Sequence, residues 1–314
     1  MSRPADRPAP PPLRVLTRHD AADGVVALTL ADPAGRPLPA WTPGAHVDLH
    51  LGGDVVRQYS LCSDPQDLSH YRIAVLDVPG GRGGSRRVHA ALRPGTELPV
   101  SAPRNRFPLT EDAADYVLIA GGIGITPLLP MAARLTALGR PWRMLYAGRS
   151  RTTMAFLGEP PPQRVTVVAE DESGRPDLAA YLAPHPRATV YACGPAGLLD
   201  AVRALHPGPV HTERFTAEPA PAPGDDGIFT VELARTGTEV TVPPGRSILE
   251  AVRAAGTPVA SSCESGICGT CETKVLAGRP DHRDDLLTPD ERACGDTMMI
   301  CVSRSADARL VLDL

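Results

Sequence analysis

The chain has 314 residues, of which 42% are hydrophobic and 22% charged, and a formal net charge of −4. This length suggests two or three domains, and so small a charge does not indicate nucleic-acid binding. No stretch approaches the roughly 18 consecutive apolar residues of a membrane span, and the proline-rich residues 1–12 lack the apolar core of a secretory signal. We therefore expect a cytoplasmic protein of three domains, preceded by a flexible tail at residues 1–12.

Residues 13–110 are predicted to form an antiparallel β-barrel. Apolar and polar residues alternate in short runs at residues 25–30, 46–51 and 71–75, and proline and glycine residues separate these runs. An alternation of this period indicates strands with one buried face.

The pattern changes in residues 111–216, which are predicted to form an α/β domain with a parallel sheet. Apolar runs now alternate with stretches of helical period, as in βαβ units. The expected strands are 116–120, 142–147, 164–169 and 189–192, and the expected helices are 127–138, 177–182 and 196–205.

A third domain, of the α+β class, is predicted for residues 227–314, after a proline-rich linker at residues 217–226. It opens with an expected hairpin of strands 228–234 and 239–242, and a short helix follows. From residue 224 onward there are 9 basic and 15 acidic residues, a net charge of −6. An acidic domain of this kind is suited to docking on a basic protein surface.

Four of the seven cysteines have the spacing of a plant-type [2Fe–2S] site. Cys263, Cys268 and Cys271 are separated by four and by two residues, and Cys301 follows after 29 more. This C-x₄-C-x₂-C…C pattern is typical of two-iron clusters held by four thiolates. Zinc is the alternative, although zinc sites favour paired C-x₂-C blocks. Cys294 competes for the fourth position, but the apolar residues just before Cys301 favour Cys301.

The residues between the first three cysteines suit a tight loop around such a cluster. Gly266 and Gly269 allow the backbone to approach the sulfur atoms closely. We expect their amide groups, with those of Ser265 and Thr270, to donate hydrogen bonds to the sulfurs and to tune the reduction potential.

Two short motifs in the barrel segment offer groups for a phosphate and for an aromatic ring system. In Arg57-Gln58-Tyr59-Ser60-Leu61, the arginine supplies a cation, the tyrosine an aromatic face and the serine a hydroxyl. Gly80-Gly81-Arg82-Gly83-Gly84-Ser85 can present backbone N–H groups and a hydroxyl to a phosphate. The alternatives are an ordinary strand and an ordinary glycine turn.

Two further motifs follow expected strands of the α/β domain. Gly121-Gly122-Ile123-Gly124-Ile125-Thr126-Pro127 leads from a strand into a helix, as a nucleotide-binding loop requires, although the G-x-G-x-x-G fingerprint is absent. Cys193-Gly194-Pro195 stands in the same context. Both motifs should lie at the carboxyl edge of the sheet, where ligands bind in α/β folds. A small buried residue is the alternative interpretation of Cys193.

Charged residues bear on the choice of nucleotide. Gly148-Arg149-Ser150-Arg151 can meet a ribose 2′-phosphate as well as a 2′-hydroxyl, and a solvated basic loop is the alternative. We expect the acidic run Glu170-Asp171-Glu172 to form a solvated loop.

Together these motifs resemble those of the phthalate dioxygenase reductase family, which includes vanillate demethylase and terephthalate dioxygenase reductases. The resemblance covers nearly the whole chain apart from the N-terminal tail, and it extends to Glu213-Arg214-Phe215. It implies a flavin-binding β-barrel, a nucleotide domain of the ferredoxin reductase type and a C-terminal ferredoxin domain of β-grasp fold. The implied cofactors are FMN, NADH and a [2Fe–2S] cluster.

The resemblance also implies roles for single residues. The implied flavin and nucleotide ligands are Arg57, Tyr59, Ser60, Gly83, Gly84, Ser85, Gly121, Gly122, Gly124, Thr126, Cys193, Gly194, Pro195 and Phe215. The implied hydride-transfer residues are Ser60, Thr126, Cys193 and Phe215, with Thr126 near the nicotinamide and Phe215 stacked on the flavin. The implied metal ligands are Cys263, Cys268, Cys271 and Cys301.

A protein of this family is expected to be the reductase component of a multicomponent oxygenase. Its electrons would pass singly to a terminal oxygenase of Rieske type that acts in aromatic degradation. A haem-thiolate monooxygenase is the alternative partner, and a non-catalytic redox sensor is a third hypothesis. We expect a monomer in isolation, with no nucleic-acid or membrane partner.

Overall fold

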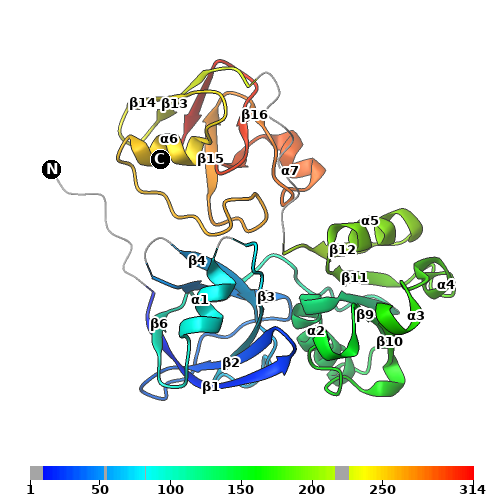
Figure 1. Ribbon diagram of the computed structural model, residues 1–314. Coiled ribbons are helices and arrows are strands. Elements are labelled where there is room, and N and C mark those ends of the chain that lie inside the picture. Colours follow the sequence, from blue (N-terminus) through cyan, green and yellow to red (C-terminus); the bar gives the residue numbers. More distant parts are fainter. Residues whose placement is uncertain (1–9, 53–54, 82, 216–225) are drawn as a thin grey trace. The chain divides into compact units, whose positions relative to one another are not determined.

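The computed structural model describes residues 10–52, 55–81, 83–215 and 226–314. They form two compact units, of which the first ends at Phe215 and the second extends to Leu314 (Figure 1). Most of the expected tail and linker lies outside the described residues. Among the described residues, no helix is long and apolar enough to cross a membrane.

The first part of unit 1 is an antiparallel barrel of two sheets. The sheets have the strand orders β5-β2-β1-β6 and β4-β3-β7, and a bridge between Leu49 and Val100 joins them. The bounds are β1 Pro12–Ala22, β2 Val25–Ala31, β3 Ala45–His50, β4 Val56–Ser60, β5 Tyr71–Leu76, β6 Glu97–Pro99 and β7 Arg104–Asn105, with helix α1 at Gly84–Ala91. Strands β2 and β3 are buried on both faces, not on the one face expected. Leu28, Leu49 and Ile73 are fully enclosed in the barrel core, and Val25 and Ala27 of β2 pack in a second core that includes residues of α2.

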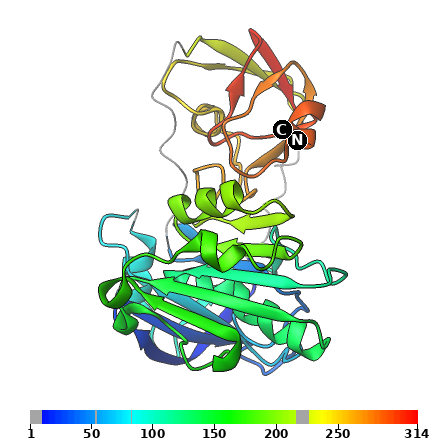
Figure 2. The same ribbon diagram turned by 90° about the vertical axis from the view of Figure 1, so that its right-hand side faces the viewer.

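The second part of unit 1 is a parallel five-stranded sheet of order β10-β9-β8-β11-β12 (Figure 2). Its strands are β8 Tyr116–Gly121, β9 Trp142–Gly148, β10 Val165–Ala169, β11 Thr189–Cys193 and β12 Val210–Glu213. The helices are α2 Ile125–Ala137, α3 Glu170–Ser173, α4 Leu178–Leu182 and α5 Ala196–Leu205, with 3-10 turns at Gly122–Gly124, Arg151–Thr153 and Pro162–Arg164.

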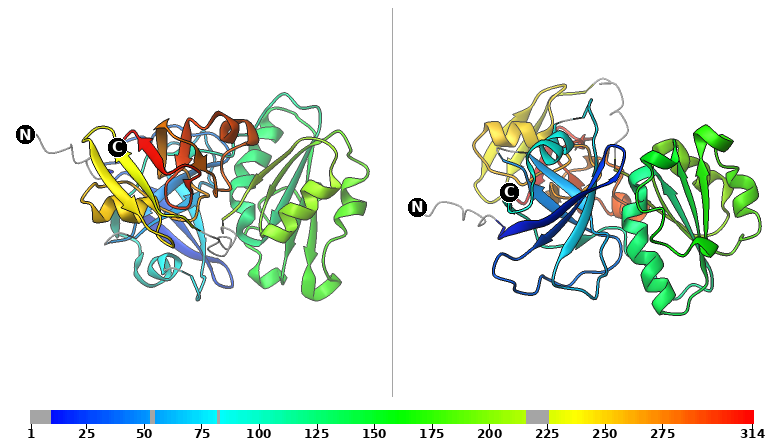
Figure 3. Two further views of the ribbon diagram at one scale, coloured as in Figure 1. Left: turned by 90° about the horizontal axis from the view of Figure 1, so that it is seen from above. Right: turned by 60° about the horizontal axis from the view of Figure 1, so that its bottom comes forward.

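Both faces of this sheet are covered, which explains why its strands are apolar without alternation. Tyr116 and Leu118 of β8 pack in the core that includes α2. Val117 and Ile119, which point the other way, pack with Leu199 of α5 in a separate core. Figure 3 shows the helices on either side of the green sheet.

Unit 2 has a mixed sheet of order β14-β13-β19-β15-β17, in which β13 and β19 are parallel neighbours. The bounds are β13 Phe229–Leu233, β14 Thr238–Val242, α6 Ile248–Ala254, β15 Glu272–Ala277, β16 Pro280–Asp281, α7 Pro289–Cys294, β17 Thr297–Met299, β18 Arg304–Ser305 and β19 Arg309–Leu312. Helix α6 begins at Ser247, whose hydroxyl accepts the Glu250 N–H while the Glu250 carboxylate accepts the Ser247 N–H.

The expected strands and helices are confirmed to within two residues at each end. One expectation is wrong: Glu170-Asp171-Glu172 is not a plain loop but the first turn of α3. The three carboxylates lie at the N-terminus of that turn, where negative charge is favoured. The hairpin of β13 and β14 is confirmed by their antiparallel pairing.

Candidate functional site

The structure brings Arg57 of β4 onto the glycine loop at the start of α1. A Cβ atom at Gly84 would come within 2.8 Å of Arg57 Nε, so a larger residue there would displace the arginine side chain. Gly83 has φ 78°, in the left-handed region that favours glycine, and α1 begins directly after it. A guanidinium beside the N-terminus of a helix is an arrangement suited to a phosphate.

The other groups of this loop have fixed partners. The Val78 N–H donates to Ser85 Oγ at 3.1 Å, which orients the hydroxyl and leaves its own proton for a ligand. Arg86 donates to the carbonyl of Pro79, and Arg87 to the carbonyls of Leu51 and Gly52. Arg57, whose Nη1 donates to the Val56 carbonyl at 2.7 Å, is the cation of the first motif and lies against Gly84 of the loop. Arg82 is outside the described residues.

The loop after β8 and the loop after β11 touch backbone to backbone. A Cβ at Gly124 would lie 2.5 Å from the Cys193 carbonyl carbon and 2.9 Å from the Gly194 nitrogen, and one at Gly121 would lie 2.7 Å from Pro195 Cδ. Glycine is thus required at both positions of the first loop. The expectation that these two motifs meet at the carboxyl edge of the sheet is confirmed by this contact.

Thr126 and Phe215 differ in their surroundings. Thr126 is the second residue of α2, is 2% exposed, and donates its hydroxyl to the Ile123 carbonyl at 3.0 Å. Phe215 follows β12 and is 39% exposed, which leaves an aromatic face accessible at the end of unit 1. Tyr59 lies on β4 between Arg57 and Ser60, and burial raises the pKa of its hydroxyl.

A carboxyl group that the sequence analysis did not select joins two of the predicted residues. The Glu213 side chain, at the end of β12, hydrogen-bonds Ser60 of β4, and its Oε2 lies 4.0 Å from Cys193 Sγ. Burial raises the pKa of Glu213 to about 8, and burial likewise raises the pKa of the Cys193 thiol well above its usual value. At neutral pH both groups therefore keep their protons.

Glu213 could have been found from one signal in the sequence. It is an acidic residue at the carboxyl end of a parallel strand, within Glu213-Arg214-Phe215, and perturbed carboxyl groups at that edge are candidates for a functional site.

The two charged runs of the nucleotide part meet in a salt bridge. Arg151 Nε lies 3.0 Å from each carboxylate oxygen of Glu172, and the Asp171 N–H donates to the Arg149 carbonyl. The parallel pairing of β9 with β10 sets the two loops side by side. One cation of the basic run is thus already matched by a carboxylate.

The four cysteines of the expected cluster lie together in unit 2. The Cys263 side chain contacts those of Cys268 and Cys301, and Cys301 contacts Cys271. All four are at most 8% exposed and form no disulfide. Cys294, at the end of α7, is exposed. Within the described part of the chain, no three His, Cys, Asp or Glu side chains are arranged to hold a single metal ion.

Backbone amides point at these sulfur atoms. The Ser265 N–H donates to Cys263 Sγ at 3.4 Å, and the Thr270 N–H donates to Cys268 Sγ at 3.5 Å. These two expected hydrogen bonds are confirmed. Gly266 has φ 74°, and a Cβ there would lie 2.7 Å from Val302 Cγ2. Four enclosed thiols with amide donors directed at sulfur fit a two-iron cluster.

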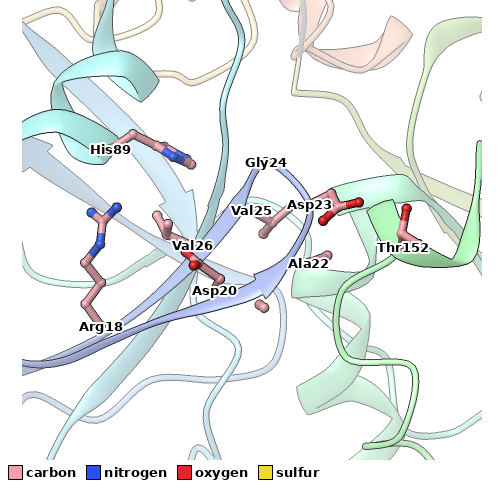
Figure 4. Close-up of a pocket in the computed structure, with 10 residues that line it drawn as sticks. Arg18, Asp20, Ala22, Asp23, Gly24, Val25, Val26, His89 and Thr152 are labelled. Atoms are coloured by element: carbon pink, nitrogen blue, oxygen red, sulfur yellow. The ribbon is translucent and has the colours of Figure 1, made fainter.

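A cavity of about 560 Å³ lies elsewhere in unit 1, between the β1–β2 turn, α1 and the 3-10 turn at Thr152 (Figure 4). Arg18, Asp20 and His89 line it. None of the predicted site residues is among its lining residues.

Comparison with known proteins agrees with this geometry. A family described as "2Fe-2S iron-sulfur cluster binding domain" matches residues 231–306. The phenoxybenzoate dioxygenase subunit beta of Ectopseudomonas oleovorans is 46% identical, with 98% of both chains covered. The solved structure of phthalate dioxygenase reductase, described as modular for electron transfer from pyridine nucleotides to [2Fe-2S], is 40% identical, with a TM-score of 0.72 and coverage of 96% of this chain and 97% of that one.

An intact type IV self-sufficient cytochrome P450 monooxygenase is also similar, at 42% identity and a TM-score of 0.89. The match covers 100% of this chain but 43% of that one, so this chain spans less than half of that protein.

The fold and the sites define an oxidoreductase with a flavin barrel, a nicotinamide-nucleotide domain and a [2Fe–2S] ferredoxin domain. The chain belongs to the phthalate dioxygenase reductase family. The expected fold class and the expected cofactors, FMN, NADH and a [2Fe–2S] cluster, are confirmed by this membership. So is the expected function as the reductase component of a multicomponent oxygenase.

Proposed function

We propose that this chain takes electrons from NADH and passes them through FMN and the [2Fe–2S] cluster to a Rieske-type oxygenase or demethylase that acts on an aromatic acid. The observation that carries the proposal is the meeting of Ser60 from the flavin strand with Glu213 and Cys193 from the nucleotide sheet. This contact brings the flavin motif and the nucleotide edge to one place. Three domains, with boundaries at residues 13–110, 111–216 and 227–314, divide these tasks.

In this proposal the flavin phosphate is held by Arg57 and the Gly83–Ser85 turn, whose N–H groups and hydroxyl surround an anion. Gly121, Gly122, Gly124, Gly194 and Pro195 give the nucleotide close access to the backbone. Tyr59 and Phe215 offer aromatic faces to the flavin ring.

The chemistry that the bound groups supply is hydride acceptance and single-electron release by the flavin and single-electron carriage by the cluster. The protein residues hold protons around that chemistry. Glu213, with its pKa near 8, retains a proton at neutral pH and holds it beside the Ser60 hydroxyl, its hydrogen-bond partner. Cys263, Cys268, Cys271 and Cys301 are the proposed cluster ligands, and Thr126 and Cys193 line the nicotinamide position.

The pairing of Arg151 with Glu172 supports NADH as the donor. The pairing leaves Arg149 as the remaining cation of the run for a 2′-phosphate, whereas a 2′-hydroxyl needs only a polar edge. Replacing the carboxylate should therefore favour NADPH.

The partner is proposed from charge and from relatives. The net charge of −6 in the last third of the chain supports docking on a basic surface, and curated relatives include dioxygenase and demethylase reductases. A haem-thiolate monooxygenase is the second candidate because of the similarity to the self-sufficient P450. We also propose a cytoplasmic monomer. Its seven free cysteines suit a reducing compartment.

Reconstitution tests the choice of partner. The purified holoprotein and NADH are mixed with a Rieske-type aromatic-acid dioxygenase, or with a haem-thiolate monooxygenase, each separated from its own reductase. Product coupled to NADH consumption with the Rieske enzyme, at a rate that falls with added salt, supports the proposal. Coupled turnover with the haem enzyme alone would replace it with the second candidate.

A further inference from the structure

Arg72 of β5 connects the barrel to the nucleotide part of unit 1 through an unusually complete set of hydrogen bonds. Its Nη1 and Nη2 atoms donate to the two carboxylate oxygens of Glu159 at 2.7 and 2.6 Å. Its Nε and Nη2 atoms also donate to the carbonyl oxygen of Cys62, at 3.2 and 2.6 Å. The planar guanidinium is therefore fixed in orientation from two sides.

The same guanidinium lies over an aromatic ring of the nucleotide part. The Arg72 Cζ atom is 4.9 Å from the centroid of Phe156, within the range of a cation–π contact. Phe156 has φ 61°, and a bulky residue adopts this backbone conformation only where its surroundings hold it there. We regard Arg72 as one of the groups that hold it.

The segment held by Arg72 is already packed against the barrel. Met154, Ala155 and Phe156 share one apolar core with barrel residues, including Val25 and Cys62. Apolar contacts of this kind have no preferred direction, whereas hydrogen bonds between the two parts fix the position of the segment along the interface.

A second hydrogen bond crosses between the same two parts. The Asp23 N–H, in the β1–β2 turn, donates to the Thr152 carbonyl at 2.8 Å, and Figure 4 shows the two residues beside each other at one end of the cavity. The barrel therefore forms hydrogen bonds to residues 152–159 of the nucleotide part at two points, and the contact made by Arg72 is the charged one of the two.

The residues on both sides of the Arg72 contact are connected to proposed cofactor sites. Cys62 lies two residues after Ser60 at the end of the flavin strand β4. Met154 fills the space beside Gly148, because a Cβ atom added at Gly148 would lie 2.8 Å from the Met154 sulfur. Gly148 is the last residue of β9. Strand β9 pairs with β8, which runs into the Gly121–Gly124 loop. A shift at residues 152–159 would thus be transmitted to the nucleotide edge.

We propose that Arg72 is a positioning residue for hydride transfer, which sets the nicotinamide loop at its working distance from the flavin by holding Glu159 and the Cys62 carbonyl together. This inference rests on the proposed function. Arg72 contacts neither reacting group, so it acts through geometry: a displacement of about 1 Å between hydride donor and acceptor can slow the step by about a hundredfold.

Anaerobic stopped-flow mixing of the full holoprotein with NADH tests the proposal in the variants Arg72→Ala and Glu159→Gln. At saturating NADH the limiting rate of flavin reduction should fall by about tenfold or more in Arg72→Ala, and by less in Glu159→Gln, while the dissociation constant of NADH changes little. The pair Arg134–Glu111 is the matched control. It is also bidentate, at 2.7 and 2.8 Å, but it does not involve the barrel strands. Arg134→Ala should keep the wild-type limiting rate.

A second readout separates positioning from general damage. When the flavin of each variant is reduced by illumination with a sacrificial electron donor instead of by NADH, the cluster should receive electrons at the wild-type rate, because that step does not use the nucleotide.

Three results would overturn the proposal: wild-type limiting rates in both variants, a loss confined to NADH affinity, or an equal loss in Arg134→Ala. If Arg72→Ala does not fold, Glu159→Gln decides alone, since the Glu159 side chain is 40% exposed and the change preserves its shape. Absence of NADH-driven flavin reduction in the wild-type protein would instead overturn the proposed function.

Discussion

Glu213→Gln should change how the stability of unit 1 depends on pH. A carboxyl group whose pKa is higher in the folded state binds its proton more tightly there than in the unfolded chain. Between the ordinary value of 4.5 and the folded value of about 8, the folded protein keeps a proton that the unfolded chain has lost, so the free energy of unfolding falls as pH rises.

The size of this effect follows from the width of that window. Each pKa unit corresponds to about 1.4 kcal/mol, so the fall reaches at most about 5 kcal/mol by pH 8 and is then complete. Glutamine keeps the shape of the side chain and a hydrogen bond for Ser60, but it does not titrate. The variant should therefore lack this pH dependence and be the more stable of the two at alkaline pH.

Urea unfolding followed by tryptophan fluorescence measures the effect. The chain has two tryptophans, and both Trp41 and Trp142 are in unit 1, so the signal reports that unit alone. The free-energy difference between wild type and Glu213→Gln should grow steadily between about pH 5 and pH 8. A difference that stays constant across this range would refute a Glu213 that is protonated at neutral pH.

Four further substitutions have defined outcomes. Cys301→Ser should abolish the cluster spectrum while flavin content is retained, and Cys294→Ser should leave both unchanged; loss of the cluster in Cys294→Ser would contradict the ligand set. Gly124→Ala should destabilise unit 1 by about 1–3 kcal/mol and weaken NADH binding, because its Cβ would meet the Cys193 carbonyl; calorimetric titration showing wild-type affinity would argue against this contact. Arg304 is 5% exposed and donates to three backbone carbonyls, so Arg304→Ala should cost unit 2 about 1–3 kcal/mol in thermal unfolding followed by cluster absorbance; an unchanged midpoint would speak against that role.

Local sequence signals predicted the elements of the fold well because each element is consistent with its surroundings. Ser247 and Gly256 bracket α6, and the Glu250 side chain completes its cap. Continuous apolar runs such as Tyr116–Ala120 indicate a sheet that is covered on both faces. The acidic run after β10 is exposed, as its charge predicts, but it forms a helical turn instead of a loop, because carboxylates also stabilise the first turn of a helix.

The site was predictable where one motif carries its own chemistry, and not where distant residues cooperate. The cysteine spacing indicated the cluster directly, and the amides of Ser265 and Thr270 follow from the same short loop. Glu213, in contrast, becomes informative only when β4 and β12 bring it to Ser60. The hydrogen bonds between Arg72 and Glu159, which are 87 residues apart in the chain, have no local signature in the sequence. They depend on how the barrel packs against the nucleotide part of unit 1.

The most direct test of the account is the order in which the bound groups are reduced. The holoprotein is mixed with NADH without oxygen in a stopped-flow instrument, and flavin and cluster absorbance are followed together. The flavin absorbance should fall first, cluster reduction should follow, and flavin-free protein should show no cluster reduction. Cluster reduction by NADH in flavin-free protein, at the rate of the holoprotein, would contradict it.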